Sequence, residues 1–121
     1  MHLNEEKGRI YMTVRVNGID LFFTRCGKGR PFLLLHGNGE THEIFRPLLD
    51  LLAKDYTVYA PDSRCHGQSG CGTLGYQEIA DDIVGLIQHF CLHRPVLCGF
   101  SDGGIVGLLI AAQHPQLLSG L

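Results

Sequence analysis

The amino-acid sequence predicts an α/β fold, in which a mostly parallel sheet carries helices on both faces and begins with a β-hairpin. Two observations support this prediction. β-rich segments alternate with segments whose apolar residues recur at helical spacing, and the dipeptide Asn17-Gly18 separates the first two β-rich segments. The chain has 121 residues, which is enough for one domain and too few for two.

The first half of the chain supplies a hairpin and one strand-helix pair. Residues 11–16 and 19–24 are β-rich, and Asn-Gly between them tolerates the positive φ angles of a type I′ turn. The apolar run at residues 32–35 predicts a strand that is covered on both faces. Residues 44–52 follow with apolar positions at helical spacing, so this strand leads into a helix.

The alternation continues in the second half. Residues 56–60 predict a strand, 76–90 an amphipathic helix with Asp81 and Asp82 on its solvated face, and 96–100 a third core strand. Residues 103–114 are apolar on nearly all sides, which predicts a helix packed inside the structure. The residues after this helix are too few to complete another strand, so the alternation stops within a strand-helix unit. The strand at 96–100 then exposes an edge, which predicts self-association.

Composition narrows the function classes. A formal charge of −2 offers no positive excess for nucleic acid or an anionic membrane surface, and no apolar run reaches the length of a membrane span or signal peptide. The five cysteines form neither a CxxC pair nor a zinc set, and Cys65, His66 and Cys71 lack regular metal-ligand spacing. We therefore expect reduced thiols, no metal and a cytoplasmic location.

Candidate chemistry follows three predicted strands, because ligands bind at the carboxyl ends of parallel strands. The segments are HGNG at residues 36–39, DSRCHGQS at 62–69 and GFSDGG at 99–104. The last matches GxSxG, the nucleophile elbow in which a sharp strand-to-helix turn raises a serine hydroxyl above the sheet. Ser101 is the candidate nucleophile, and the N–H of Asp102 at the start of the helix could stabilise an oxyanion.

These three segments, in this order and on these elements, resemble the α/β-hydrolase fold family over the whole chain. The resemblance implies that Ser101 is the nucleophile, that the backbone N–H groups of Asn38 and Asp102 form the oxyanion hole, and that no cofactor is needed. It also implies that His36 and Gly37 shape the active-site loop.

Two positions distinguish this chain within the resemblance. Cys65 stands where the family's DxRGxGxS turn usually has its first glycine. A serine at position 101 differs from the aspartate nucleophile of the epoxide-hydrolase and dehalogenase branches.

The resemblance also indicates that catalytic groups are missing. The family's triad follows the order Ser, then Asp or Glu, then His, and only Asp102 and His114 follow Ser101. Asp102 belongs to the elbow, and His114 lies about 20 Å along the helix. We therefore expect residues 1–121 to be the N-terminal part of a single α/β-hydrolase domain, with strands 1–5 and without the triad acid and histidine. His36 and His66 are less favoured as a replacement base.

The expected function is that of a carboxylesterase-like serine hydrolase acting on small esters or related acyl substrates, inactive as this segment alone. One alternative is a non-catalytic binding module that retains the elbow as architecture. Another is a nucleotide-binding protein, because Gly37-Asn38-Gly39 and Asp62 imitate a dinucleotide fingerprint, although His42 occupies the third glycine position. The sequence does not identify the substrate.

Overall fold

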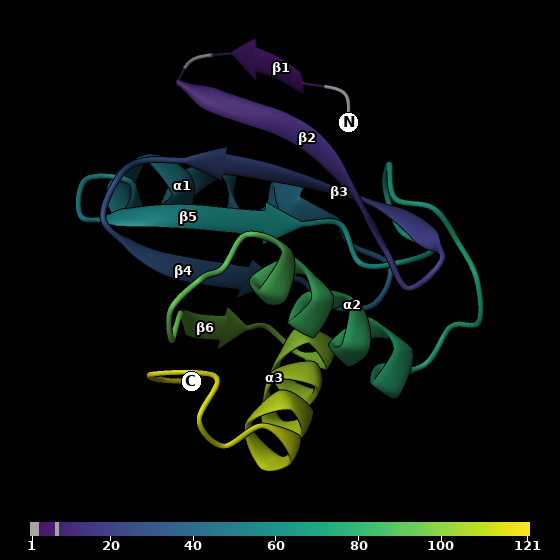
Figure 1. The fold of residues 1–121 in the computed structure, drawn as a ribbon. Coiled ribbons are helices and arrows are strands. Elements are labelled where there is room, and N and C mark those ends of the chain that lie inside the picture. The colour runs from purple at the N-terminus through teal and green to yellow at the C-terminus, as the bar shows by residue number, and fades with distance from the viewer. Residues whose placement is uncertain (1–2, 7) are drawn as a thin grey trace.

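In the computed structural model, which describes residues 3–6 and 8–121, a six-stranded sheet carries helices on both faces (Figure 1). The order of the strands is β1-β2-β3-β5-β4-β6. No helix of the described residues is long and apolar enough to cross a membrane. The elements are β1 (Leu3–Glu6), β2 (Arg9–Val16), β3 (Ile19–Cys26), β4 (Arg30–Leu35), the 3₁₀-helix η1 (His42–Phe45), α1 (Arg46–Leu52), β5 (Tyr56–Pro61), α2 (Tyr76–His89), β6 (Val96–Gly99) and α3 (Asp102–Gln113).

The predicted hairpin is confirmed. Val16 pairs with Ile19, and Asn17 and Gly18 have φ angles of 45° and 81°, as a type I′ turn requires. Strand β1 was not predicted, because the segment Leu3–Glu6 is short and rich in charge. It adds to the outer edge of the hairpin by antiparallel pairing with β2.

The sheet is mixed rather than mostly parallel. The pairs β1-β2, β2-β3 and β3-β5 are antiparallel, whereas β4 pairs in parallel with both β5 and β6. The carboxyl ends of these three parallel strands lie at one edge of the sheet, as the sequence indicates. This edge carries the three segments that were singled out for their chemistry.

Strand β4 is covered on both faces, as its apolar run predicts. Leu33 and Leu35 belong to the core cluster that includes α2 and α3, and Leu34 belongs to a second cluster with Leu49 of α1. Leu33 and Leu34 are fully buried. The helices therefore pack on opposite faces of the sheet, and β4 lies between β5 and the edge strand β6.

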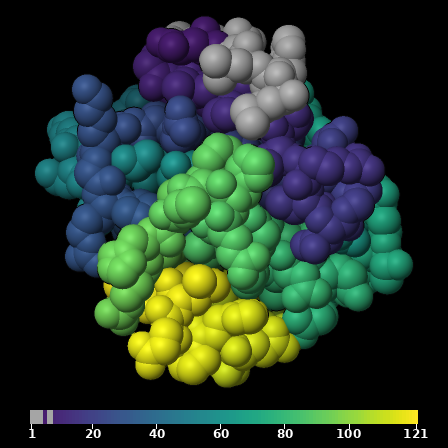
Figure 2. Space-filling model, in the orientation of Figure 1, coloured from purple at the N-terminus to yellow at the C-terminus, as the bar shows by residue number. Residues whose placement is uncertain are grey.

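Helix α3 is not enclosed on all sides. Val106 and Ile110 are buried against the sheet, but Ile105 and Leu108 are 42% and 64% exposed. This apolar side adjoins β6, whose outer edge is paired at the bridge between Val96 and Gly120. In Figure 2 the C-terminal residues, coloured yellow, form the lower end of the face shown.

We predict that this apolar side of α3 drives self-association of the chain, because exposed apolar surface beside a strand edge favours pairing. The substitution Leu108→Glu should shift the chain toward the monomer in light scattering at tens of micromolar. The matched control is Leu51→Glu on α1, a position that is 59% exposed on the opposite face of the sheet. Equal association of both variants would contradict the prediction.

Candidate functional site

The turn at Ser101 joins β6 to α3 with a backbone that L-residues rarely adopt. Ser101 has φ 56° and ψ −118°, and its side chain is exposed. Such a conformation costs on the order of 1–3 kcal/mol at a non-glycine residue, and it persists only where surrounding contacts enforce it. The strand thus passes into the helix through a sharp turn, as the sequence predicts, whereas the role of Ser101 as a nucleophile stays a prediction.

Two glycines make this turn sterically possible. A Cβ atom on Gly103 would overlap the carbonyl oxygen of Leu35, and one on Gly99 would overlap the carbonyl group of Gly103. The first turn of α3 therefore lies directly on the end of β4. The Phe100 N–H group also donates to the Leu35 carbonyl oxygen at 2.9 Å, which fixes the end of β6 beside β4.

The loop after β4 lies against the elbow. A Cβ atom on Gly37 would be 3.2 Å from Cβ of Ser101. The Glu40 N–H group donates to the Gly37 carbonyl oxygen at 3.2 Å, and Gly39 has φ 77°, a combination typical of a type II turn with Asn38 at its second position. We call residues 37–40 the β4 turn.

Two backbone donors at this junction are unpaired. Within the described part of the chain, no atom accepts a hydrogen bond from the N–H groups of Asn38 and Asp102. Both residues line a cleft of about 270 Å³. Ser101 lines the neighbouring hollow along β6 and α3, so it lies at the boundary between the two. The other residues lining the cleft are Leu35, His36, Gly37, Ser63, His66, Leu74, Gly75, Tyr76, Ile79, Gly103 and Val106.

Tyr76, at the start of α2, reaches the elbow from across the cleft. Its hydroxyl donates to Asp102 Oδ1 at 3.1 Å, and this hydrogen bond raises the pKa of Tyr76 above its ordinary value. Sequence analysis missed this contact, because the two residues are 26 positions apart in the chain.

His36 and His66, the two histidines considered as a replacement base, both have their ring nitrogens engaged in hydrogen bonds. His36 Nδ1 lies 2.7 Å from the Gly37 carbonyl oxygen, and its Nε2 accepts the Ser63 N–H at 3.0 Å. Burial lowers the pKa of His36, although its hydrogen bond to Gly37 opposes this effect. In His66, Nδ1 contacts the Arg64 carbonyl oxygen and Nε2 contacts the Gly39 N–H. Both rings hold loops in place.

A buried carboxylate joins the segment after β5 to the start of η1. Asp62 Oδ1 accepts the His42 N–H at 2.8 Å and lies 2.7 Å from His42 Nδ1, while Oδ2 accepts the Gln68 N–H at 3.0 Å. Burial raises the pKa of Asp62, but these hydrogen bonds outweigh burial and leave the pKa below its usual value. The resemblance marks Asp62, whereas His42 is missed by the sequence analysis.

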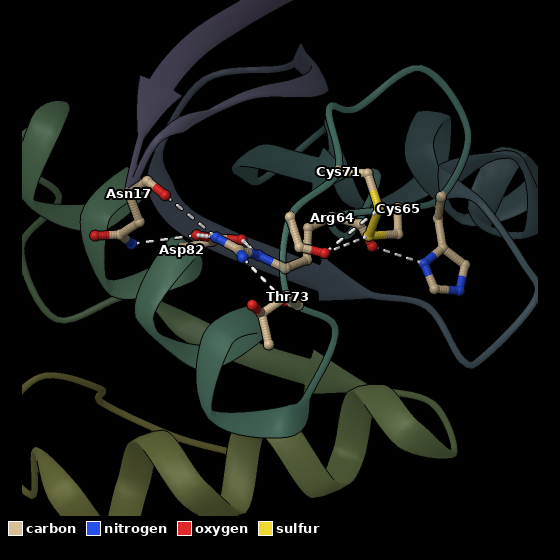
Figure 3. The surroundings of a disulfide bond; sticks show 8 residues. Asn17, Arg64, Cys65, Cys71, Thr73 and Asp82 are labelled. Carbon is tan, nitrogen blue, oxygen red and sulfur yellow. Dashed lines mark hydrogen bonds and ion pairs between the residues drawn. A yellow bond between two sulfur atoms is a disulfide. The ribbon is translucent and has the colours of Figure 1, made fainter.

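Asp82 is buried and paired, so the prediction that it is solvated is wrong. Arg64 donates from Nε and Nη2 to the two carboxylate oxygens of Asp82 at 2.7 and 2.8 Å, and both side chains are almost fully buried (Figure 3). Hydrogen bonding to Asp82 raises the pKa of Arg64, so the guanidinium stays charged. Arg64 also donates to the carbonyl groups of Asn17 and Thr73. One side chain thus connects the hairpin, the loop after β5 and α2.

The expectation that all five cysteines are reduced is also wrong. Cys65 and Cys71 form a disulfide that closes the turn after β5 (Figure 3). Cys65 has φ 66°, the left-handed conformation that explains why a glycine is usual at this position. Because each sulfur is bonded to the other, these cysteines cannot serve as thiolate metal ligands. The disulfide also removes the argument for a cytoplasmic location that rested on reduced thiols.

We predict that the disulfide takes over the conformational role of the glycine at position 65. The double variant Cys65→Ala/Cys71→Ser loses the cross-link and keeps a Cβ atom in the left-handed conformation. The matched variant Cys65→Gly/Cys71→Ser loses only the cross-link. The alanine variant should be less stable than the glycine variant by about 1–2 kcal/mol in denaturant unfolding. Equal stability of the two variants would show that the turn relaxes freely without the disulfide.

With this geometry established, comparisons with known proteins give the family. Residues 30–121 match the family model for the alpha/beta hydrolase fold. The chain is 34% identical over 107 residues to a 2-(acetamidomethylene)succinate hydrolase from Mesorhizobium japonicum, and 35% identical over 115 residues to the human serine hydrolase BPHL. Each match covers 87% of this chain, but only 38% and 39% of the respective relative.

Solved structures agree with the sequence comparisons. Wild-type Cfl2 from Burkholderia cenocepacia superposes with a TM-score of 0.90 at 27% identity, over 97% of this chain and 42% of that one. An epoxide hydrolase from Vigna radiata superposes at 0.88 with 27% identity, over 95% and 38%. The chain thus spans about two fifths of the length of these proteins, and their shared fold overturns the dinucleotide-binding alternative. This chain belongs to the α/β-hydrolase fold family.

Proposed function

We propose that this chain carries the nucleophile and the oxyanion hole of a serine hydrolase that acts on esters or related acyl compounds. The observation that carries the proposal is the strained backbone of Ser101, with two unpaired N–H groups, those of Asn38 and Asp102, at the same junction. A serine raised on such a turn is accessible to a carbonyl carbon, and unpaired amides can stabilise the negative charge that develops on the carbonyl oxygen.

The reaction would begin with attack of Ser101 Oγ on the acyl carbon, with the Oγ proton passing to a general base. The leaving alcohol takes a proton as the acyl-enzyme forms, and water then releases the acid. Within the described residues, the ring nitrogens of His36, His42 and His66 are engaged by loops, and His114 stands at the far end of α3. The base and its acid are expected from the segment by which the relatives are longer.

The relatives support hydrolysis, and the identity of residue 101 distinguishes acyl transfer from epoxide hydrolysis. They include proteins named as hydrolases, and one of them, a soluble epoxide hydrolase from a Corynebacterium species, is 30% identical over 108 residues. The resemblance associates epoxide opening with an aspartate nucleophile, whereas this chain has Ser101. Acyl transfer through serine is therefore favoured over epoxide hydrolysis.

A cytoplasmic location remains a prediction.

The first prediction for this function concerns dependence on the segment by which the relatives are longer. The 121-residue chain should hydrolyse p-nitrophenyl acetate marginally, because loss of the triad in a serine protease costs about 10⁶ in kcat. A chain extended with the C-terminal segment of a relative should give a burst of product, and Ser101→Ala should abolish it. A binding module would give no burst and no labelling by a fluorophosphonate. Ordinary turnover by the 121-residue chain, lost in His36→Ala or His66→Ala, would place a base within it.

The second prediction separates the Asn38 side chain from its backbone. Proline is favoured at the second position of a type II turn, so Asn38→Pro preserves the β4 turn while it removes the N–H donor. In the extended chain, Asn38→Pro should raise the barrier by about 2.7–4 kcal/mol through kcat, whereas Asn38→Ala should change the rate little. Equal rates for the two variants would eliminate this donor.

A further inference from the structure

His66 connects the disulfide-closed turn after β5 to the β4 turn, and its two contacts define its protonation state. The Gly39 N–H can only donate, so Nε2 at 3.0 Å must accept. The Arg64 carbonyl oxygen can only accept, so Nδ1 at 3.0 Å must carry the proton. The pair of contacts is satisfied only by the neutral imidazole with its proton on Nδ1.

The turn that carries His66 is held at several points. The His66 N–H donates to the Ser63 carbonyl oxygen at 3.0 Å, and the His66 carbonyl oxygen accepts the Ser69 N–H at 3.1 Å. The disulfide between Cys65 and Cys71 closes the same turn. Its backbone therefore presents the imidazole to Gly39 from a fixed position.

The N–H group that His66 accepts belongs to the peptide between Asn38 and Gly39. This central peptide has opposite orientations in type I and type II turns, and glycine at the third position permits both. The hydrogen bond to Nε2 favours one orientation. It thereby fixes the segment that carries the unpaired Asn38 N–H.

We propose that His66 is a positioning residue, whose neutral imidazole holds the β4 turn in the orientation that presents the Asn38 N–H to the cleft. The role of the Asn38 N–H in this statement rests on the proposed function, whereas the hold on Gly39 does not. His66 lies at the cleft without supplying a proton to the reaction, since both ring nitrogens are engaged.

Protonation of His66 breaks the contact, because imidazolium donates from both nitrogens and cannot accept the Gly39 N–H. The ring is faced by His36, whose centroid is 5.1 Å away, and the groups around it include Glu40 on the β4 turn and Tyr76 and Asp102 across the cleft. Asp62 and Arg64 flank it on its own segment. The β4 turn should therefore loosen wherever His66 becomes protonated.

The test compares three forms of the 121-residue chain by nuclear magnetic resonance. His66→Gln keeps an acceptor oxygen near the position of Nε2 but does not titrate, and His66→Phe keeps a planar ring without an acceptor. In the unaltered chain, ¹⁵N spectra should show an unprotonated Nε2. The Gly39 amide should exchange with solvent about tenfold faster in His66→Phe than in the unaltered chain, and His66→Gln should restore most of the protection.

The pH profile gives the decisive comparison. As the pH is lowered, and after correction for intrinsic exchange, protection of the Gly39 amide should fall further in the unaltered chain than in His66→Gln, whose side chain keeps its acceptor oxygen. Burial lowers the pKa of His36 and the charge of His66 lowers it further, so the His36 ring is followed separately in both forms. Identical profiles, or a protonated Nε2 at pH 7.5, would overturn the proposal, and the glutamine variant decides even if His66→Phe does not fold.

A rate measurement separates this proposal from the proposed function. In the extended chain, the rate at which p-nitrophenyl acetate acylates Ser101 should decline at low pH. This decline should be smaller in His66→Gln. If Ser101→Ala leaves the burst intact, the proposed function fails while the hold on Gly39 stands. If the burst depends on Ser101 but His66→Gln has the acid-side decline of the unaltered chain, the positioning role fails while the proposed function stands.

Discussion

The site depends on one close approach of backbone to backbone, where the first turn of α3 lies on the end of β4. No side chain fits between Gly103 and the Leu35 carbonyl group. This contact sets the height of α3 above the sheet, and it therefore sets the strained conformation of Ser101 and the distance from Ser101 to Gly37. The apolar cores on both faces of the sheet hold β4 and α3 firmly enough to maintain the strain.

Hydrogen bonds from buried and half-buried polar side chains, rather than further apolar packing, hold the loops around this contact. Asp62 joins the segment after β5 to η1 through His42, and His36 and His66 each join it to the segment after β4. The ring nitrogens of His36 and His66 contact backbone groups, and the His42 ring lies between the carboxylates of Asp62 and Glu43. Loops would otherwise be mobile at a sheet edge, and here they are fixed to one another while the N–H groups facing the cleft stay unpaired.

Sequence analysis predicted what local patterns encode. The hairpin turn at Asn17-Gly18, the buried strand β4 and the elbow at Ser101 each have a signal within a few residues. Asp82 looked solvated because the helical pattern cannot show that Arg64 lies opposite it. The disulfide was missed because a spacing of six residues has no geometric meaning until the turn is known. The exposure of α3 could not be predicted from its composition. An apolar residue favours burial, but the sequence does not show whether another element covers it.

The buried pair of Arg64 and Asp82 has a consequence for how this chain can change over generations. Replacing either partner alone leaves an unpaired charge in the interior, at a cost of about 3–5 kcal/mol, which is a large part of the stability of a small domain. A substitution at one position is therefore tolerated only with a matching change at the other. Arg64 also contacts the hairpin at Asn17. Such a change would therefore have to preserve the packing among the hairpin, the loop after β5 and α2. We therefore expect Arg64 and Asp82 to be replaced together during evolution and not one at a time.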